Sequence, residues 1–467
     1  MNMPRLRAAL SVLASAGALA GCSMIPTYER PAAPVAAQWP GSPPAVATST
    51  PPAAELPWQT FVGDAALREV ITLALANNRD LRVAVLNIEQ VRAAWQIRRA
   101  DQFPTVNLAA AGSRQPKSDG SGDLTSLYSA GLAMASWEID FFGRIASLKE
   151  AALAQYLATE EARRATQTSL IAAVTTTWLS LRSNDELLAL TQRTLATRED
   201  SLRLTRLRFD HGAASALDFR QAESLTASAR ATLAQQQRLR ALDVNALTLL
   251  VGQPLPDAAL PAGGTAPLFP EVPAGLPSDL LTRRPDIRQA EQQLIAANAN
   301  IGAARAAFFP RISLTASAGT ASNELSGLFK GGAWGFTLAP QALLTVFDAG
   351  RNQASLDSAR AGREIAVAQY EKAIQTAFRE VADALAGRAT LGEQVRAQQA
   401  QADAEADRFR LADLRYRNGV ASYLDVLDAQ RSLFAAQQAL VQTRLAYSQN
   451  QVALYKALGG GASPALP

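Results

Sequence analysis

The side chains that carry out most protein chemistry are nearly absent from this sequence. Its 467 residues include one histidine, His211, and one cysteine, Cys22. A zinc centre, a Ser-His-Asp triad or a Cys-His pair needs histidine or cysteine partners that the chain lacks. The sequence also contains no P-loop, GxSxG or GxGxxG motif. We therefore predict that the protein is not an enzyme and has no cofactor and no resident metal.

Lipid attachment is the chemistry that the sequence does favour, at Cys22. The apolar stretch Ala8–Ala20 follows two arginines and is too short to span a bilayer. Residues 19–22 read LAGC and look like the lipobox of bacterial lipoproteins, which implies cleavage of a signal peptide, 1–21, and acylation of Cys22. Several acyl chains give a firm anchor. Ser23 follows, where an Asp commonly retains such lipoproteins at the inner membrane, so we expect an outer-membrane lipoprotein. The alternative is an ordinary secretory signal, and in both cases the mature protein leaves the cytoplasm.

The remaining candidate residues lie in a segment that the chain contains twice. FDHGAASALDFRQAESL, from Phe209, recurs 207 residues later as YRNGVASYLDVLDAQRSL, so that Gly212 corresponds to Gly419. A second pair of matching segments ends in Phe103-Pro104 and Phe309-Pro310, at a separation of 206. Internal duplication of this kind indicates two tandem copies of one structural unit. Little room is left for a separate catalytic domain.

Two acidic residues follow the second glycine. Asp425 forms a Ser-x-x-Asp capping box with Ser422, and the first copy repeats this box, so capping alone could explain Asp425. Asp428 differs, because Gln221 occupies its place in the first copy. The turn therefore does not require an acid at that position, and Asp428 is the better candidate for a function.

Each copy has the order helix, strand, strand, long helix, turn, helix. Alternating apolar residues predict short strands, and the absence of proline predicts two helices of some 65 residues, or roughly 100 Å each. The predicted strands are about 104–113, 126–137, 311–320 and 333–341; the predicted helices are about 144–211, 216–250, 351–418 and 423–458. The predicted domains are the signal peptide, an acylated N-terminal tether at 22–60, a first repeat at 61–251, a proline-rich linker or strap at 252–277, a second repeat at 278–458 and a flexible tail at 459–467.

The four strands have the length of tilted transmembrane β-strands. Four strands cannot close a barrel, and an open sheet edge is not viable in lipid. If the strands enter a membrane, several chains must share one barrel. The alternative is an ordinary antiparallel sheet on a soluble helical protein.

Five motifs carry a resemblance that covers essentially the whole mature chain. They are WEIDFFGR from Trp137, RRPDIRQAEQQL from Arg283, FFPRISL from Phe308, YRNGVASYLDVLDAQRSLF from Tyr416 and LYKALGGG from Leu454. The chain resembles the outer membrane factors, the TolC-like family, in its OprM/NodT lipoprotein branch. The resemblance implies a homotrimer whose twelve-stranded β-barrel in the outer membrane continues as a long periplasmic α-helical barrel. It also implies that a periplasmic membrane-fusion adaptor and an inner-membrane RND pump dock below, so that drugs and other small molecules leave through the tunnel.

The same resemblance implies a gate at the second turn. Asp425 and Asp428 match acidic constriction rings, Leu424 matches an apolar constriction, and Arg431 matches a basic residue beside the ring. A ring of carboxylates from several chains would raise its own pKa and attract cations. The Gly212 and Gly419 turns would form the tip that faces the adaptor. Ala421 stands where TolC has an arginine, which argues against a latch of that type.

Three other interpretations remain open at the level of sequence. A type I protein secretion duct belongs to the same family, although the lipobox and the OprM-like motifs argue against it. A periplasmic coiled-coil adaptor would carry a lipoyl-like domain between its hairpin helices, and no such segment interrupts either hairpin. An enzyme is disfavoured by the single histidine. The net charge of +4 is made of interspersed acids and bases, which argues against nucleic acid as a partner.

Overall fold

The computed structural model describes residues 23–40, 53–116, 122–256, 260–261, 269–275 and 277–462. The chain divides into two compact units. Unit 1 contains the residues up to Ala32, Asn87–Glu160 and Gln289–Glu371, and unit 2 contains Ala33–Leu86, Glu161–Arg288 and the residues from Lys372 onward. No helix within these described ranges combines the length and the apolarity needed to cross a membrane.

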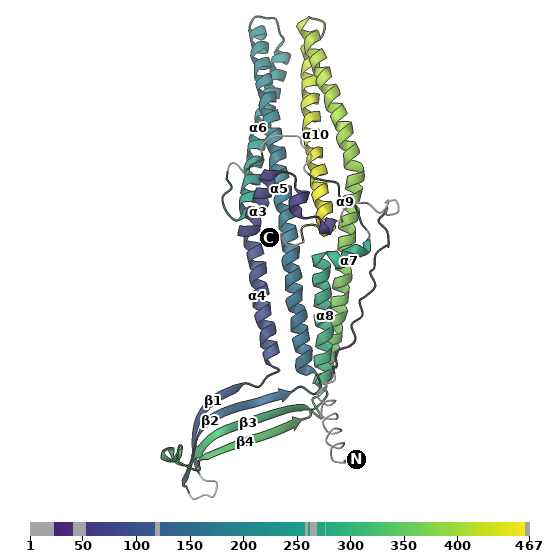
Figure 1. Cartoon of the computed structure of the whole chain (residues 1–467). Coiled ribbons are helices and arrows are strands. Elements are labelled where there is room, and N and C mark those ends of the chain that lie inside the picture. The colour runs from purple at the N-terminus through teal and green to yellow at the C-terminus, as the bar shows by residue number, and fades with distance from the viewer. Residues whose placement is uncertain are drawn as a thin grey trace. The chain divides into compact units, whose positions relative to one another are not determined.

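The elements follow the duplicated order expected from the sequence (Figure 1). The helices of the first repeat are α2 (Trp58–Phe61), α3 (Ala65–Asn77), α4 (Arg79–Ala100), α5 (Arg144–Asp210) and α6 (Ala216–Val251). Those of the second are α7 (Leu280–Arg283), α8 (Pro285–Ala306), α9 (Arg351–Arg417) and α10 (Tyr423–Ala457). The strands are β1 (Val106–Pro116), β2 (Leu124–Ile139), β3 (Arg311–Ser322) and β4 (Trp334–Leu343), with short 3-10 turns at η1 (Ala53–Glu55), η3 (Pro277–Asp279) and η4 (Leu325–Gly327). All four strands end two or three residues later than the sequence-based ranges, because backbone pairing continues past the alternating segments.

Unit 1 contains one antiparallel sheet in the order β1-β2-β3-β4 (Figure 1). Each strand pairs only with its neighbours in sequence, so β1 and β4 each have one unpaired edge. The register between β2 and β3 shifts between Met134 and Trp137. Ser136 lies at this shift with a positive φ of 45°, which marks a β-bulge in β2.

Charged and aromatic contacts fix the end of the sheet where β2 leads into α5. Glu138 pairs with Arg144 at 2.7 Å and with Arg311 at 2.5 Å. Phe142 stacks on Phe309 with 4.8 Å between the ring centroids. These contacts explain why the WEIDFFGR and FFPRISL motifs contain their particular residues: they join the first repeat to the second beside the sheet.

Unit 2 holds two helical hairpins, formed by the greater parts of α5 and α9 with α6 and α10 (Figure 1). Its core includes a pile of aromatic rings, in which Phe61 stacks on Tyr455 at 3.9 Å and on Phe269 at 4.9 Å. Phe269 belongs to the proline-rich linker, so the described part of that linker packs into unit 2. The Tyr455 hydroxyl donates to the carbonyl of Leu56.

The described parts of both chain ends make specific contacts. In the segment predicted as an N-terminal tether, Trp39 and Trp58 are buried, and Trp39 stacks on Phe378 and donates to the Gly275 carbonyl. Burial of two large indole rings stabilises this docking. At the start of the predicted C-terminal tail, residues 459–461 are buried and the Gly461 carbonyl accepts a hydrogen bond from Gln167.

Candidate functional site

The two turns between paired helices are built in the same way. Gly212 and Gly419 follow α5 and α9 with φ of 75° and 73°, in the left-handed region where glycine is favoured. The amides of the next residues, Ala213 and Val420, donate back to Arg208 and Arg415 carbonyls, as in a Schellman motif. A Cβ on either glycine would meet no atom within 4 Å. Backbone conformation, not crowding, therefore requires glycine here.

Asp425 has a structural role in the second turn. Its amide donates to Ser422 Oγ at 3.3 Å, and its carboxylate accepts from the Ser422 amide at 3.1 Å. Ser215 and Asp218 form the same capping box at the start of α6. The cap satisfies amides that the first helical turn leaves free, and it places a negative charge at the positive end of the helix dipole.

Asp428 lies between two arginines. Its Oδ2 accepts from Arg408 of α9, and its Oδ1 accepts from Arg431 of α10, each at 2.5 Å. Arg408 also pairs with Glu405 at 3.2 Å. Arg408, Asp428 and Arg431 form what we term the second-turn cluster. The hydrogen bond from Arg408, followed by that from Arg431, lowers the pKa of Asp428.

Within one chain, the electrostatics of Asp428 differ from those expected for a ring of carboxylates from several chains. The expected rise in the pKa of Asp428 depended on carboxylates from several chains, whereas within one chain two guanidinium groups lower it. Among the described residues no group of three or more His, Cys, Asp or Glu side chains is arranged to hold a metal ion. Leu424 is adjacent to the capping Asp425 and is 54 % exposed, free to contact another molecule.

The second-turn cluster has no charged counterpart in the first repeat. At the separation of 207 residues, Arg408, Asp428 and Arg431 correspond to Ser201, Gln221 and Ser224. The caps are thus shared by both turns. The charged residues of the second-turn cluster have no equivalents in the first hairpin, whose ion pairs Arg220–Glu223 and Arg230–Glu199 lie at other positions. Sequence comparison found the Asp428–Gln221 difference, but it missed Arg408, which lies on the other helix of the hairpin.

The two hairpins also contact each other near the turns. Arg208, in the last turn of α5, donates to the Tyr416 hydroxyl, and its guanidinium lies 5.2 Å from the centre of the Tyr416 ring. The Tyr416 ring also contacts the ring of Tyr423 at the start of α10, in a tilted arrangement with 5.2 Å between the centroids. Tyr416 therefore links the two hairpins through both its ring and its hydroxyl, a role that sequence spacing did not indicate.

Earlier in α5, away from the turn, Arg198 is buried between the hairpins. It is 4 % exposed, donates to the Leu225 carbonyl of α6 at 3.0 Å, and lies 5.3 Å from the Phe434 ring of α10. No carboxylate in the described part of the chain pairs with it, and its Nε has no hydrogen-bond partner there. Burial lowers the pKa of this guanidinium. The contact joins α5, α6 and α10 around one desolvated charge.

Cys22 lies outside the described residues. The described chain begins at Ser23 and runs along α8, where Asn298 donates to the Pro26 carbonyl and Glu291 pairs with Arg30 at 2.7 Å. Tyr28 donates to the same carboxylate at 3.1 Å. The segment that follows the predicted lipid attachment is therefore held by specific contacts.

The sheet of unit 1 has two different faces, because neighbouring side chains in a strand point to opposite sides. One face is small and weakly polar: Asn107, Ala109, Ala111, Ser129, Gly131, Ala133, Ser317, Gly319, Ala321, Gly335 and Thr337. The other has the large apolar and aromatic side chains of Val106, Leu108, Tyr128, Leu132, Met134, Trp334, Phe336 and Leu338, together with the polar Arg114, Ser126, Thr320 and Ser322. Leu108 and Phe336 are 85 % and 73 % exposed, so this apolar face is uncovered in the single chain.

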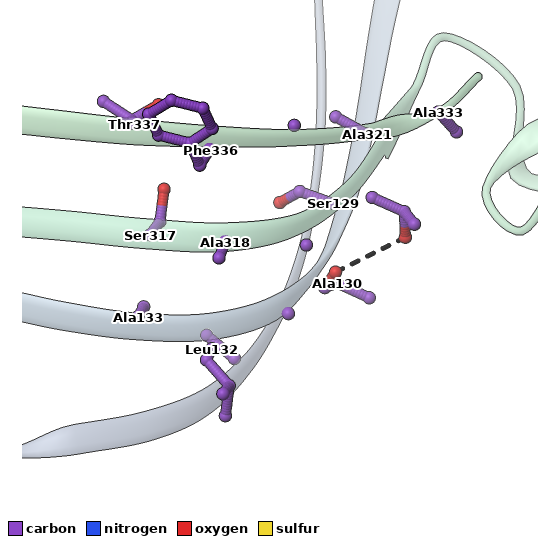
Figure 2. Close-up of a pocket in the computed structure, with 15 residues that line it drawn as sticks. Ser129, Ala130, Leu132, Ala133, Ser317, Ala318, Ala321, Ala333, Phe336 and Thr337 are labelled. Atoms are coloured by element: carbon purple, nitrogen blue, oxygen red, sulfur yellow. Dashed lines mark hydrogen bonds between the residues drawn. The ribbon is translucent and has the colours of Figure 1, made fainter.

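A groove of about 260 Å³ lies where the sheet bends, and Figure 2 shows the short side chains of Ser129, Ala133 and Ser317 around it. Gly131 and Gly319 pair across β2 and β3, and a Cβ on Gly131 would lie 2.5 Å from the Gly319 Cα. The bend therefore depends on both glycines, and the groove offers no charged side chain that could hold a ligand.

Comparisons with known proteins cover nearly all of the chain. The model of the family described as outer membrane efflux protein matches residues 70–253 and 276–460, one match for each repeat. The toluene efflux pump outer membrane protein TtgC of Pseudomonas putida is 50 % identical, over 97 % of this chain and 95 % of its own. Outer membrane protein OprJ of Pseudomonas aeruginosa is 46 % identical, over 97 % and 95 %. The crystal structure of the open state of the MtrE outer membrane channel of Neisseria gonorrhoeae aligns with a TM-score of 0.86 at 42 % identity, covering 94 % of this chain and 99 % of that one.

Proposed function

This chain belongs to the outer membrane efflux protein family, and we propose that it forms the outer-membrane exit channel of a tripartite efflux pump. The observation that carries the proposal is the sheet of unit 1, with two unlike faces and two unpaired edges. An apolar, aromatic face suits lipid, and a face of small polar residues suits a water-filled channel. Efflux of small organic molecules, in keeping with the name of the TtgC relative, is the proposed activity.

A homotrimer accounts for the unpaired strand edges. Four strands are too few to close a barrel, and three copies supply twelve, in which every edge of one copy meets an edge of the next. The long helices of the three copies would continue the channel as an α-helical barrel. A periplasmic membrane-fusion adaptor and an inner-membrane RND pump are the proposed partners, with the Gly212 and Gly419 turns as the surface that meets the adaptor.

The proposed gate is the second turn. Leu424 narrows the channel, Asp425 holds the helix start in place, and the second-turn cluster of Arg408, Asp428 and Arg431 joins the two helices of the hairpin. In this proposal the gate opens when α9 and α10 move relative to each other. The cluster joins these two helices and therefore resists opening. Loss of the Asp428 charge would break the charged contact between α9 and α10, while Arg408 keeps its pairing with Glu405.

Planar-bilayer recordings of the purified mature protein test both the channel and the gate. We expect small, cation-preferring conductances for wild type, and larger, less cation-selective ones for Asp428→Asn, since the charged contact between α9 and α10 and its negative charge are then lost. Asp403→Asn is the matched control, because Asp403 is an exposed acid of the same hairpin that bonds only Gln399 among the described residues. Equal currents from all three proteins would remove Asp428 from the gate, and absence of channels from folded protein would contradict the proposed function.

Cys22 is proposed as the lipid anchor in the outer membrane. Mass spectrometry of the mature N-terminus should detect fatty acids on Cys22 in wild type and none in Cys22→Ser. An unmodified, processed wild-type N-terminus would indicate an ordinary secretory signal instead.

A further inference from the structure

Resting on the proposed channel, we infer that β4 of one copy pairs with β1 of the next in one definite register. In this register Ala342 lies opposite Ala110 of the next copy, and Val346 lies opposite Val106 of the next copy. The partner is a second copy of this chain, and the register follows from the internal repeat.

The two β-hairpins of the sheet supply equivalent positions. In the first hairpin Val106 pairs with Met134, and in the second Ile312 pairs with Ala342. Val106 and Ile312 each lie two residues after the repeated Phe-Pro pair. Met134 of β2 and Ala342 of β4 therefore occupy the same place in their repeats.

The pairing of β2 with β3 inside one chain serves as the template for the joint between copies, that is, for the pairing of β4 with β1 of the next copy. It connects the first hairpin to the second and pairs Met134 with Ala316. Ala342 is equivalent to Met134, and Ala110 is equivalent to Ala316 at the separation of 206. If each residue of the Met134–Ala316 pair is replaced by its equivalent in the other repeat, Ala342 lies opposite Ala110 of the next copy.

The other end of the same joint gives an independent pair. Ile139 pairs with Ile312. Ile139 and Val346 each lie four residues before the Gly-Arg pair at the start of a long helix, so they are equivalent. Since Val106 is equivalent to Ile312, Val346 lies opposite Val106 of the next copy.

Both deduced pairs belong to a single register, because four residues separate Ala342 from Val346 and four separate Val106 from Ala110. The joint inside the chain is different, since the bulge at Ser136 adds one residue to β2. The joint between copies is thus predicted to be free of a bulge.

Side-chain direction agrees with this register, although it was not used to derive it. Ala339 falls opposite Ser113 of the next copy, both on the small face, and Leu344 falls opposite Leu108 of the next copy, both on the apolar face. A slip by one residue would place small residues against apolar ones along the whole joint.

The position at which β4 ends also agrees with the proposed register. β2 continues to Ile139, but β4 stops at Leu343, three residues short of the equivalent Val346. Val346 is 91 % exposed, and Leu108 on the edge of β1 is 85 % exposed. A neighbouring β1 would extend β4 to Val346 and cover these side chains.

Cysteine cross-linking of the full-length protein in outer membranes tests the register. Ser113→Cys is combined in turn with Thr337→Cys, Ala339→Cys and Gln341→Cys. Directly opposite residues come within disulfide range, whereas diagonal ones lie about 7–8 Å apart. We expect a covalent oligomer ladder on oxidation only with Ala339→Cys. Each single-cysteine variant should give no ladder.

Ala133→Cys with Ser317→Cys is the folding control, because these residues are partners inside one chain and should form a disulfide without a ladder. A ladder from Thr337→Cys or Gln341→Cys would overturn the register and leave the oligomer intact. If no pair gives a ladder while the control disulfide forms and chemical cross-linking detects only monomers, the proposed oligomeric channel fails.

Hydrogen exchange on wild type gives a second readout: slow exchange in Leu344–Val346 is expected in membranes, and fast exchange there would contradict the extension of β4.

Discussion

At the scale of single residues, the contact between Arg208 and Tyr416 is the clearest link between the hairpins near their turns. Tyr416→Phe removes the hydroxyl that accepts from Arg208 and keeps the ring. We expect the channel to spend more time open in bilayer recordings, roughly fivefold for a lost contact of about 1 kcal/mol. Tyr423→Phe is the matched control, since that hydroxyl has no partner in the described structure. Equal effects from the two substitutions would show that the hydrogen bond does not restrain opening.

For Arg198 we predict that removing a contact between the hairpins stabilises the protein. A buried guanidinium with one carbonyl partner and an unsatisfied Nε carries a desolvation cost that an apolar side chain avoids. Arg198→Met should therefore keep the contact with Phe434 and raise the thermal unfolding midpoint of the purified protein, by on the order of 1 kcal/mol in stability.

Arg193→Met on the exposed side of the same helix is the control for Arg198→Met, and it should leave the midpoint nearly unchanged. If Arg198→Met lowers the midpoint more than Arg193→Met does, the buried charge is a net stabiliser of the joint between hairpins.

Sequence reasoning proposed candidate residues that lie within one helical turn of each other on the same helix. Asp428 and Arg431 are three residues apart, and the repeat singled out Asp428 through its Gln221 counterpart. Arg408, Arg208 and Arg198 were missed, because their partners lie on another helix. Spacing along one chain contains no signal for which residues of two long helices come into register, and only the packed hairpins determine this.

At the scale of elements, the two turns allow a paired test of backbone strain. Gly419→Ala and Gly212→Ala each force a Cβ into the left-handed region but create no clash. We expect each to destabilise its own turn by about 1 kcal/mol, seen as faster hydrogen exchange in the first residues of α10 or α6. Unchanged exchange in both variants would show that the turns relax without cost.

The order of elements was predictable from the sequence because proline, glycine and alternation mark the ends of helices and strands. The packing of the N-terminal segment was not predictable in the same way. A segment rich in proline and alanine is typical of a tether, and its two tryptophans become informative only when Phe378 and the Gly275 carbonyl are seen to receive one of them.

At the scale of the whole molecule, the lowered pKa of Asp428 predicts how the channel responds to acid. A carboxyl group with a lowered folded-state pKa stabilises the folded arrangement above its unfolded value, here 3.8, and loses this contribution as the pH falls through the folded pKa. The second-turn cluster therefore stays charged at moderate acidity. We expect the open time of wild type to be constant from about pH 8 to about pH 5. A rise within that range to the level of Asp428→Asn would show that neighbouring chains dominate the titration of Asp428.

The two turns share one kind of cap, and they differ at the positions of the second-turn cluster, where the first repeat has Ser201, Gln221 and Ser224. This asymmetry has an evolutionary consequence. After a gene doubles its own length, one copy can preserve the scaffold while mutations accumulate in the other. A few substitutions in the second repeat could then change how firmly its helices are joined, without any change in the caps that both turns share.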